Sequence, residues 1–527
     1  MPRKSVMKHD FSQVPRADIP RSRFDRSHGF KTTFDAGLLI PVFLDEVLPG
    51  DTFNLRMTAF GRLATPLHPF MDNMFLESFF FFVPNRLVWD NWQKFCGEQT
   101  NPGDSTDFVI PTVDFGTVSE ASLPDYFGLP LGNTPAVNTL PFRCYNLIFN
   151  EWFRDENLQD SATVPTGDGP DGTGIWPMRR RGKRHDYFTS CLPWPQKGTA
   201  VQLPLGTTAP VLGIGKVNQT FNDGAQNVYE TGGAGTTSYA QSELVHGGGT
   251  SEQQYRIEED PNNAGFPGIF ADLTNATAAT INQIREAFQI QRLYERDARG
   301  GTRYTEIVRS HFGVTSPDQR LQRPEYLGGG SSMVNVNPVA QTSESGTTPQ
   351  ANLAAVGTLN ASGHGFVKSF TEHGHVVGLV CIRADLNYQQ GVNRMWSRST
   401  RWDFYWPALS HIGEQAVLNK EIYNDVAGGT NDNVFGYQER YAEYRYKPSL
   451  ITSAFRSDAA TPLDTWHLAQ DFATLPVLDD TFIQENPPVD RVIAVPTEPH
   501  FLFDAYFDFH CARPMPMYGV PGMIDHF

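Results

Sequence analysis

The sequence of 527 residues has no long hydrophobic run, although 39% of its residues are apolar. A membrane-spanning helix needs ~20 consecutive apolar residues, and the apolar runs here are only a few residues long. Residues 1–24 are basic but lack the apolar centre that a secretory signal requires. We therefore expect no membrane insertion, and we expect the chain to remain in the cytoplasm of the cell that makes it.

Cysteine is scarce, and its pattern excludes a disulfide framework. The five cysteines are an odd number, are widely spaced and include no CxxC pair. We expect free, mostly buried thiols in a reducing compartment. They are Cys96, Cys144, Cys191, Cys381 and Cys511.

Motifs for catalysis and for metal binding are also missing. There is no HExxH, no GxSxG and no kinase set, and "GIGK" (213–216) lacks the rest of a phosphate loop. His373 and His375 share a strand face, with His364 upstream, but no second ligand pair accompanies them. An alternative interpretation, a β-sandwich glycosidase, would need paired carboxylates in a cleft; "RDEN" and "IEED" supply carboxylates, but a helix surface and a loop explain them better. We predict no enzyme activity, no cofactor and no metal.

Charge is abundant but uneven. The net charge of −16 argues against a protein that coats nucleic acid with its whole surface. Residues 1–31 nevertheless carry eight Lys/Arg against three Asp, and "RRRGKR" (179–184) carries five basic groups without an acid. Both segments are predicted to contact nucleic acid, with Tyr187 and Phe188 near enough to stack on bases. The residues assigned to this contact are Arg3, Lys4, Lys8, Arg179, Arg180, Arg181, Lys183 and Arg184.

Other interpretations of the two basic segments stay open. The segment 179–184 also fits a solvated loop or a set of salt bridges between subunits. The N-terminal segment also fits an arm that ties subunits together, because its prolines keep it extended.

The chain divides into an arm, a β-rich core and an insertion. Residues 1–33 are predicted to form the basic extended arm. Residues 34–199 and 281–527 form the core, with strands spread from end to end and a few helices in the connections. Residues 200–280 hold 12 Gly, eight acids and two bases, which is typical of a surface insertion. A second loose Gly/Ser/Thr stretch is expected near 328–363.

Four consecutive phenylalanines, Phe79 to Phe82, stand in the predicted strand "MFLESFFFFVP". Side chains alternate between the two faces of a strand, so both faces of this one need an apolar cover. We expect the sandwich core on one face and the following helix or a neighbouring subunit on the other. The predicted subunit-contact residues are Phe79, Phe80, Phe81, Phe82, Trp89 and Trp92.

Several long phrases resemble one family. They include "YNLIFNEWFRDENL", "RHDYFTSCLPWPQKG", "FGYQERYAEYRYKPSLITSAFRS" and the C-terminal "RPMPMYGVPGMIDHF". Together they are similar to the major capsid protein of the Microviridae, small single-stranded DNA bacteriophages, and within them to the gokushoviruses. The likeness runs over nearly the whole chain except for residues 200–280.

The resemblance implies a mainly β fold, an eight-stranded antiparallel viral jelly roll with long loop insertions and a few short helices. It also implies a T=1 icosahedral shell of sixty copies around a circular single-stranded DNA genome, helped by a small basic DNA-packaging protein. The insertion would form protrusions at the three-fold axes and meet a receptor on the host bacterium. A phage receptor-binding or adhesion protein with a β-sandwich fold is the alternative; it predicts small oligomers and no closed shell.

Overall fold

The computed structural model describes residues 20–198, 281–315, 322–425 and 428–519, together with the backbone of short strands between 211 and 271. The chain separates into two compact units, residues 1–195 with 300–527, and residues 196–299. The second unit is larger than the predicted insertion of 200–280, because it includes the helix α4 (Ile281–Gly300).

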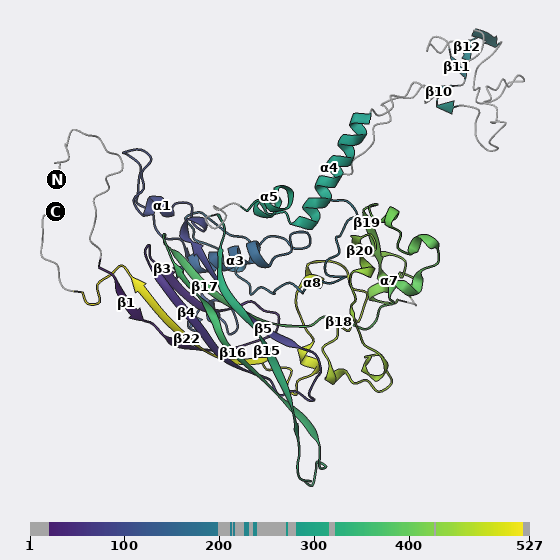
Figure 1. The fold of residues 1–527 in the computed structure, drawn as a ribbon. Coiled ribbons are helices and arrows are strands. Elements are labelled where there is room, and N and C mark those ends of the chain that lie inside the picture. The colour runs from purple at the N-terminus through teal and green to yellow at the C-terminus, as the bar shows by residue number, and fades with distance from the viewer. Residues whose placement is uncertain are drawn as a thin grey trace, which may run out of the picture. The chain divides into compact units, whose positions relative to one another are not determined.

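The first unit is built on one antiparallel sheet of nine strands (Figure 1). In order along the sheet they are β1 (Ser22–Asp25), β22 (Phe501–Arg513), β4 (Thr52–Leu63), β16 (Leu353–Ser369), β15 (Glu325–Ala340), β5 (Met74–Pro84), β17 (Gly374–Ala384) and β3 (Ile40–Val47), while β2 (His28–Phe34) also pairs with β22.

The first two strands occupy a single position in this sheet. Strand β1 pairs with the end of β22, from Arg513 to His510, and β2 pairs with its beginning, from Phe507 to Phe501. The sheet therefore has eight strand positions, which in chain order run 1-8-3-6-5-4-7-2. Positions 1-8-3-6 form one four-stranded half and positions 5-4-7-2 form the other, which is the strand order of a jelly roll. The predicted eight-stranded fold is therefore confirmed. Part of the predicted arm, residues 22–33, belongs to the sheet.

The sheet consists of two half-sheets, one of β1, β2, β22, β4 and β16 and one of β15, β5, β17 and β3, and the hairpin of β15 and β16 joins them. The first part of β15 pairs with β5, the last part of β16 pairs with β4, and the remaining parts, Val334–Ala340 and Leu353–Leu359, pair with each other. Figure 1 shows the hairpin extending beyond the neighbouring strands. Backbone hydrogen bonds thus run without interruption from one half-sheet to the other.

This hairpin occupies the stretch near 328–363 that was expected to be loose. Its glycines serve close packing rather than flexibility. A Cβ on Gly329 would lie 2.0 Å from the carbonyl oxygen of Ser78, and one on Gly330 would lie 2.5 Å from the ring of His364. Only a residue without a side chain allows β15 to come this close to its neighbours.

The interior of the sandwich follows from alternation along the strands. In β22, Phe501, Phe503, Phe507 and Phe509 are buried, whereas Leu502 and the other intervening side chains point outward. The predicted pattern of this strand is confirmed. Between the half-sheets these rings meet the inward side chains of β3, β4, β5 and β17 in one core.

Strand β5 is covered on both faces by its own chain. Phe80 and Phe82 point into the sandwich, where the Phe82 ring lies 4.7 Å from that of Phe370. Phe79 and Phe81 point to the other side and pack on a second cluster supplied by the connection after β5, with the Phe79 ring 5.3 Å from Phe153. The helix α3 (Leu140–Ile148) and the single turn η2 (Phe149–Phe153) form this cover.

The connection between β5 and β15 carries further short elements beside α3 and η2. They are η1 (Asn85–Leu87), α1 (Trp92–Phe95), β6 (Thr112–Val113), β7 (Thr117–Val118), α2 (Leu123–Tyr126), β8 (Gly132–Asn133), β9 (Val137–Asn138), η3 (Thr173–Ile175) and α5 (Tyr304–Phe312). The second unit contributes β10 (Val211–Leu212), β11 (Ile214–Lys216), β12 (Gln226–Glu230), β13 (Thr236–Tyr239), β14 (Phe270–Ala271) and α4.

The connection between β17 and β22 is the second long excursion from the sheet. It contains β18 (Asn387–Tyr388), η5 (Arg394–Ser397), η6 (Arg401–Asp403), η7 (Pro407–Leu409), β19 (Glu414–Leu418), α7 (Asn419–Ile422), β20 (Val434–Glu439), η8 (Ala442–Tyr444), β21 (Ser449–Leu450), η9 (Ser453–Phe455), η10 (Asp464–Trp466), α8 (Asp480–Ile483) and η11 (Val489–Arg491). Of the helices in the part of the chain that is described, none is long and apolar enough to span a membrane.

Replacement of Phe80 by Ala tests the sandwich core. The Phe80 side chain is 1% exposed, so we expect the change to lower the free energy of unfolding by about 3–5 kcal/mol. Phe60→Ala on β4 is the matched control, because this ring is 50% exposed and its loss should cost about 1 kcal/mol. Urea unfolding of the unassembled protein measures both values, and equal losses would contradict the assigned core.

Candidate interaction surfaces

The basic segment Arg179–Arg184 is tied into its own chain. Its backbone pairs with the residues before β3: the Leu39 N–H donates to the carbonyl of Arg179, and the Arg181 N–H donates to that of Gly37, both at 2.9 Å. The guanidinium of Arg180 donates to the carbonyl oxygens of Ala36 and Glu485, each at 3.2 Å. The backbone of the segment is therefore held by bonds to its own chain, and the segment is not a solvated loop.

Glu77 on β5 gathers the charges of this segment. Its carboxylate pairs with Arg181, with Arg383 on β17 at 2.8 Å and with Arg184 at 3.6 Å. Arg184 also pairs with Asp385 at 3.0 Å. Burial alone would raise the pKa of Glu77, but the neighbouring guanidinium groups outweigh it and hold the pKa below its usual range.

Of the two remaining cations of the segment, Arg179 lies 5.4 Å from the ring centre of Phe149, and Lys183 is buried against another aromatic ring. Its ammonium lies 4.4 Å from the ring centre of Phe482, and burial lowers its pKa. Tyr187 and Phe188, predicted to be near enough to bases for stacking, are both buried in a third apolar cluster. Stacking on nucleic acid is therefore not open to these two rings. Of the other predicted contacts, Arg3, Lys4 and Lys8 lie outside the described residues.

The predicted subunit-contact residues divide into two groups. Phe80, Phe81, Phe82 and Trp89 are at most 5% exposed, and the Trp89 indole donates to Asp168 at 2.7 Å. These four stabilise a single copy and present no surface to another, because the connection after β5 already covers the outer face of that strand. Phe79 and Trp92 are partly buried and retain some accessible surface.

The three histidines considered as metal ligands have other partners, and the ring of His373 lies 5.5 Å from that of Trp92. His364 lies between the hydroxyls of Ser78 and Ser332, at 2.8 and 3.0 Å. His375 contacts the side chain of Asn85 at 2.9 Å, and burial lowers its pKa to about 4, so the ring is neutral at neutral pH. Within the described ranges, no group of three or more His, Cys, Asp or Glu side chains converges as a metal site would.

An exposed aromatic surface is one of two features that the sequence analysis did not predict. It lies on the excursion between β17 and β22, where the density of rings and arginines in "RMWSRSTRWDFYWP" was the available signal. We define it by Trp396, Trp402, Phe404, Tyr405, Trp406 and Arg401, all exposed. Trp396 alone is 74% exposed. Large exposed apolar patches on soluble proteins mark contact sites.

The aromatic surface is held in one conformation by local bonds. The Asp403 carboxylate accepts from the backbone N–H groups of Thr400 and Ser399, at 2.7 and 3.0 Å. The Trp406 indole donates to the carbonyl of Arg401 at 2.8 Å, and the Arg401 guanidinium lies 4.1 Å from the ring centre of Trp402. Such preorganisation lowers the entropy lost when a surface binds a partner.

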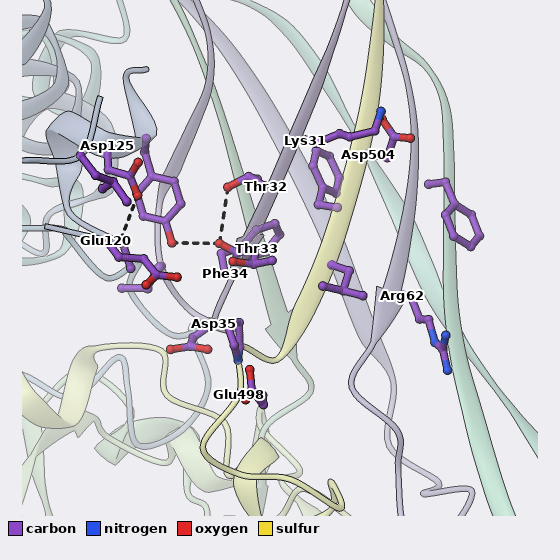
Figure 2. A pocket seen from close by; sticks show the side chains of 18 of the residues that line it. Lys31, Thr32, Thr33, Phe34, Asp35, Arg62, Glu120, Asp125, Glu498 and Asp504 are labelled. Carbon is purple, nitrogen blue, oxygen red and sulfur yellow. Dashed lines mark hydrogen bonds and ion pairs between the residues drawn. The ribbon is translucent and has the colours of Figure 1, made fainter. Parts of the chain in front are cut away.

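A second open surface is an acidic cleft of 1140 Å³ on the outer face of the half-sheet that contains β2, β4 and β22 (Figure 2). Its floor includes the half-exposed Phe60 and Leu502. Asp35, Glu120, Asp125 and Glu498 lie on one side in Figure 2, whereas Arg62 lies on the other. Lys31 pairs with Asp504 at 3.0 Å at the edge.

The electrostatic character of the cleft is visible in its one buried phenol. Tyr126 donates to the carbonyl of Thr33 at 3.0 Å. Burial, together with the negative charges of Asp35, Asp125 and Glu120, raises the pKa of Tyr126 to about 12. Among the described residues, no cation lies within ion-pair distance of Glu120 or Glu498. Five carboxylates line the cleft against two cations, Lys31 and Arg62.

Replacement of Glu77 by Gln tests whether the basic segment is structural. The change leaves the largely buried guanidinium groups of Arg181 and Arg383 without a counter-charge, so we expect unfolding to become easier by about 2–3 kcal/mol. The exposed pair of Lys31 and Asp504 supplies the control, since Asp504→Asn should cost less than about 1 kcal/mol. Thermal and urea unfolding measure the stability of both variants. An unchanged stability for Glu77→Gln would show that the ion pairs of Glu77 do not stabilise the fold.

Comparison with known proteins assigns the chain to a family. Residues 12–523 match the family described as capsid protein (F protein). The chain is 49% identical over 531 residues to capsid protein VP1 of Bdellovibrio phage phiMH2K, with 98% of each chain covered. It is 44% identical over 589 residues to capsid protein VP1 of Chlamydia phage 1, with 98% of each covered, and 36% identical over 551 residues to that of Spiroplasma virus 4, with 98% and 97% covered. The predicted resemblance is thereby confirmed, and the chain belongs to the capsid proteins of Microviridae-like phages.

Proposed function

We propose that this capsid protein assembles as sixty copies into a T=1 icosahedral shell around a circular single-stranded DNA genome. The observation that carries the proposal is the match over residues 12–523 to phage capsid proteins, joined to a jelly roll with open surfaces at its periphery. A shell needs repeated contacts between identical copies, and those around its three-fold and five-fold axes join two different patches of neighbouring copies.

The DNA-facing side is proposed to depend on the N-terminal basic residues. Of the two basic segments, Arg179–Arg184 is largely committed to bonds within the chain, whereas Arg3, Lys4 and Lys8 belong to the stretch with a local charge of +5 from eight cations and three acids. Contacts of cations with phosphates release counterions and need no sequence recognition. A small basic packaging protein would supply further neutralisation, because the chain as a whole carries −16.

The insertion 200–280 is proposed to meet the receptor on the host cell. Its eight acids against two bases make it unsuited to the DNA side of a shell. It also belongs to a compact unit separate from the jelly roll. Synthesis in the bacterial cytoplasm agrees with five free thiols, four of which are buried.

Electron microscopy of the purified protein tests the container directly. We expect closed particles of uniform small diameter that protect single-stranded DNA from added nuclease, because a shell excludes the enzyme from its interior. Small open oligomers, with DNA fully digested, would instead favour an adhesion protein.

Deletion of residues 200–280 tests the division of roles. The insertion lies outside the unit that contains the jelly roll, so we expect the shortened chain to form shells but to lose binding to host cells. A shell of the full-length protein is the control in a cell-binding assay. If the shortened chain remains soluble and folded but no longer assembles, the insertion is architectural and its proposed role in attachment fails.

A further inference from the structure

One copy of the chain leaves two unlike surfaces open. The aromatic surface offers large rings and a guanidinium group. The acidic cleft offers an apolar floor and the carboxylates of Glu120 and Glu498, with which no described cation pairs. The two surfaces are complementary. The rings of the aromatic surface can cover Phe60 and Leu502, and its cation can pair with Glu120 and Glu498. Trp, Tyr and Arg are the residues that dominate the binding energy of protein interfaces.

The geometry of the cleft suits protein side chains. Its volume of 1140 Å³ exceeds the ~300–1,000 Å³ that is typical of pockets for small molecules. Its floor is formed by strands of the sheet, which hold Phe60 and Leu502 at fixed positions. The wall that carries Glu120 and Asp125 belongs to the connection around α2, where the Asp125 carboxylate accepts from the Ala121 N–H at 2.9 Å.

Single-stranded DNA is a poorer occupant for the aromatic surface. Of its nearby arginines, Arg394 pairs with Glu421 at 3.0 Å and Arg398 pairs with Glu443 at 3.2 Å. Among the described residues, Arg440 donates to the carbonyl of Trp402 at 3.4 Å, and Arg401 covers the ring of Trp402, so two arginines are left to meet a phosphate. Binding to a strand of DNA requires a row of free cations and free ring faces. The acidic cleft would repel phosphate altogether.

We propose that the aromatic surface of one copy docks into the acidic cleft of a neighbouring copy, with Arg401 facing Glu120 and Glu498. The inference rests on the proposed shell and names one of its contacts. The contact joins two different patches, so repetition around a symmetry axis closes a ring without leaving either patch open. The opposite charges fix how the two copies are aligned, and burial of the aromatic rings supplies most of the binding free energy of the contact.

Charge reversal and its rescue test this contact. Arg401→Glu and the double change Glu120→Lys with Glu498→Lys should each raise the protein concentration needed for shell formation by at least about tenfold, since close interfacial charge pairs contribute more than ~1.4 kcal/mol. A chain that carries all three changes should regain most of the loss, because the pairing is restored with its signs exchanged. Light scattering and electron microscopy follow assembly.

Matched controls use exposed charges outside both surfaces. Arg456→Glu and Glu98→Lys alter the net charge by the same amount per site and should assemble as the unchanged chain does. Urea unfolding of each variant verifies that the fold is retained.

The outcomes separate this inference from the proposed function. If the unchanged chain forms no shells, the container itself is refuted and the contact with it. If the unchanged chain assembles and the combined variant shows no recovery, or the single reversals have no effect, the docking is wrong. If Arg401→Glu leaves assembly intact but weakens binding of an oligothymidine strand, the aromatic surface serves nucleic acid and the docking is likewise overturned.

Discussion

The fold depends on burial of one half-sheet on both faces. Every residue of β17 is buried, and β5 beside it directs phenylalanines alternately into the sandwich and into the cluster around α3. Fully burying one such ring contributes ~1.5–3 kcal/mol. The connection after β5 is therefore a structural layer of the molecule rather than a loop, and the other half-sheet keeps its outer face open to partners.

The sequence predicted those features whose signal lies in neighbouring residues, and it did not predict those that depend on residues far apart in the chain. Alternation in Phe501–Phe509 predicted a half-buried strand, and the run Phe79–Phe82 predicted a strand that needs two covers; both depend on neighbouring positions only. Which segment covers Phe81 depends on residues some seventy positions later, as the 5.5 Å approach of its ring to Trp152 shows. The sequence therefore predicted that Phe81 needs a cover, and it left open whether the following helix or a neighbouring subunit supplies it.

Charge was the least predictable property, because its meaning depends on tertiary partners. The segment Arg179–Arg184 has the composition of a phosphate-binding stretch, but Glu77 and Asp385, distant in sequence, neutralise much of it. The acidic cleft was invisible for the same reason: Asp35, Glu120 and Glu498 are brought together only by the fold. The aromatic surface had a local signal in the sequence, its density of rings. Such a density more often indicates a buried core, and only the exposure of the rings in the structure distinguishes a surface from a core.

The hairpin of β15 and β16 has a mechanical consequence for any wall made from this protein. In a sandwich of two separate sheets, a force that separates the sheets breaks only the side-chain contacts between them. Here the two half-sheets belong to one continuous hydrogen-bonded sheet. Separating them must therefore also break the backbone hydrogen bonds between Val334–Ala340 and Leu353–Leu359.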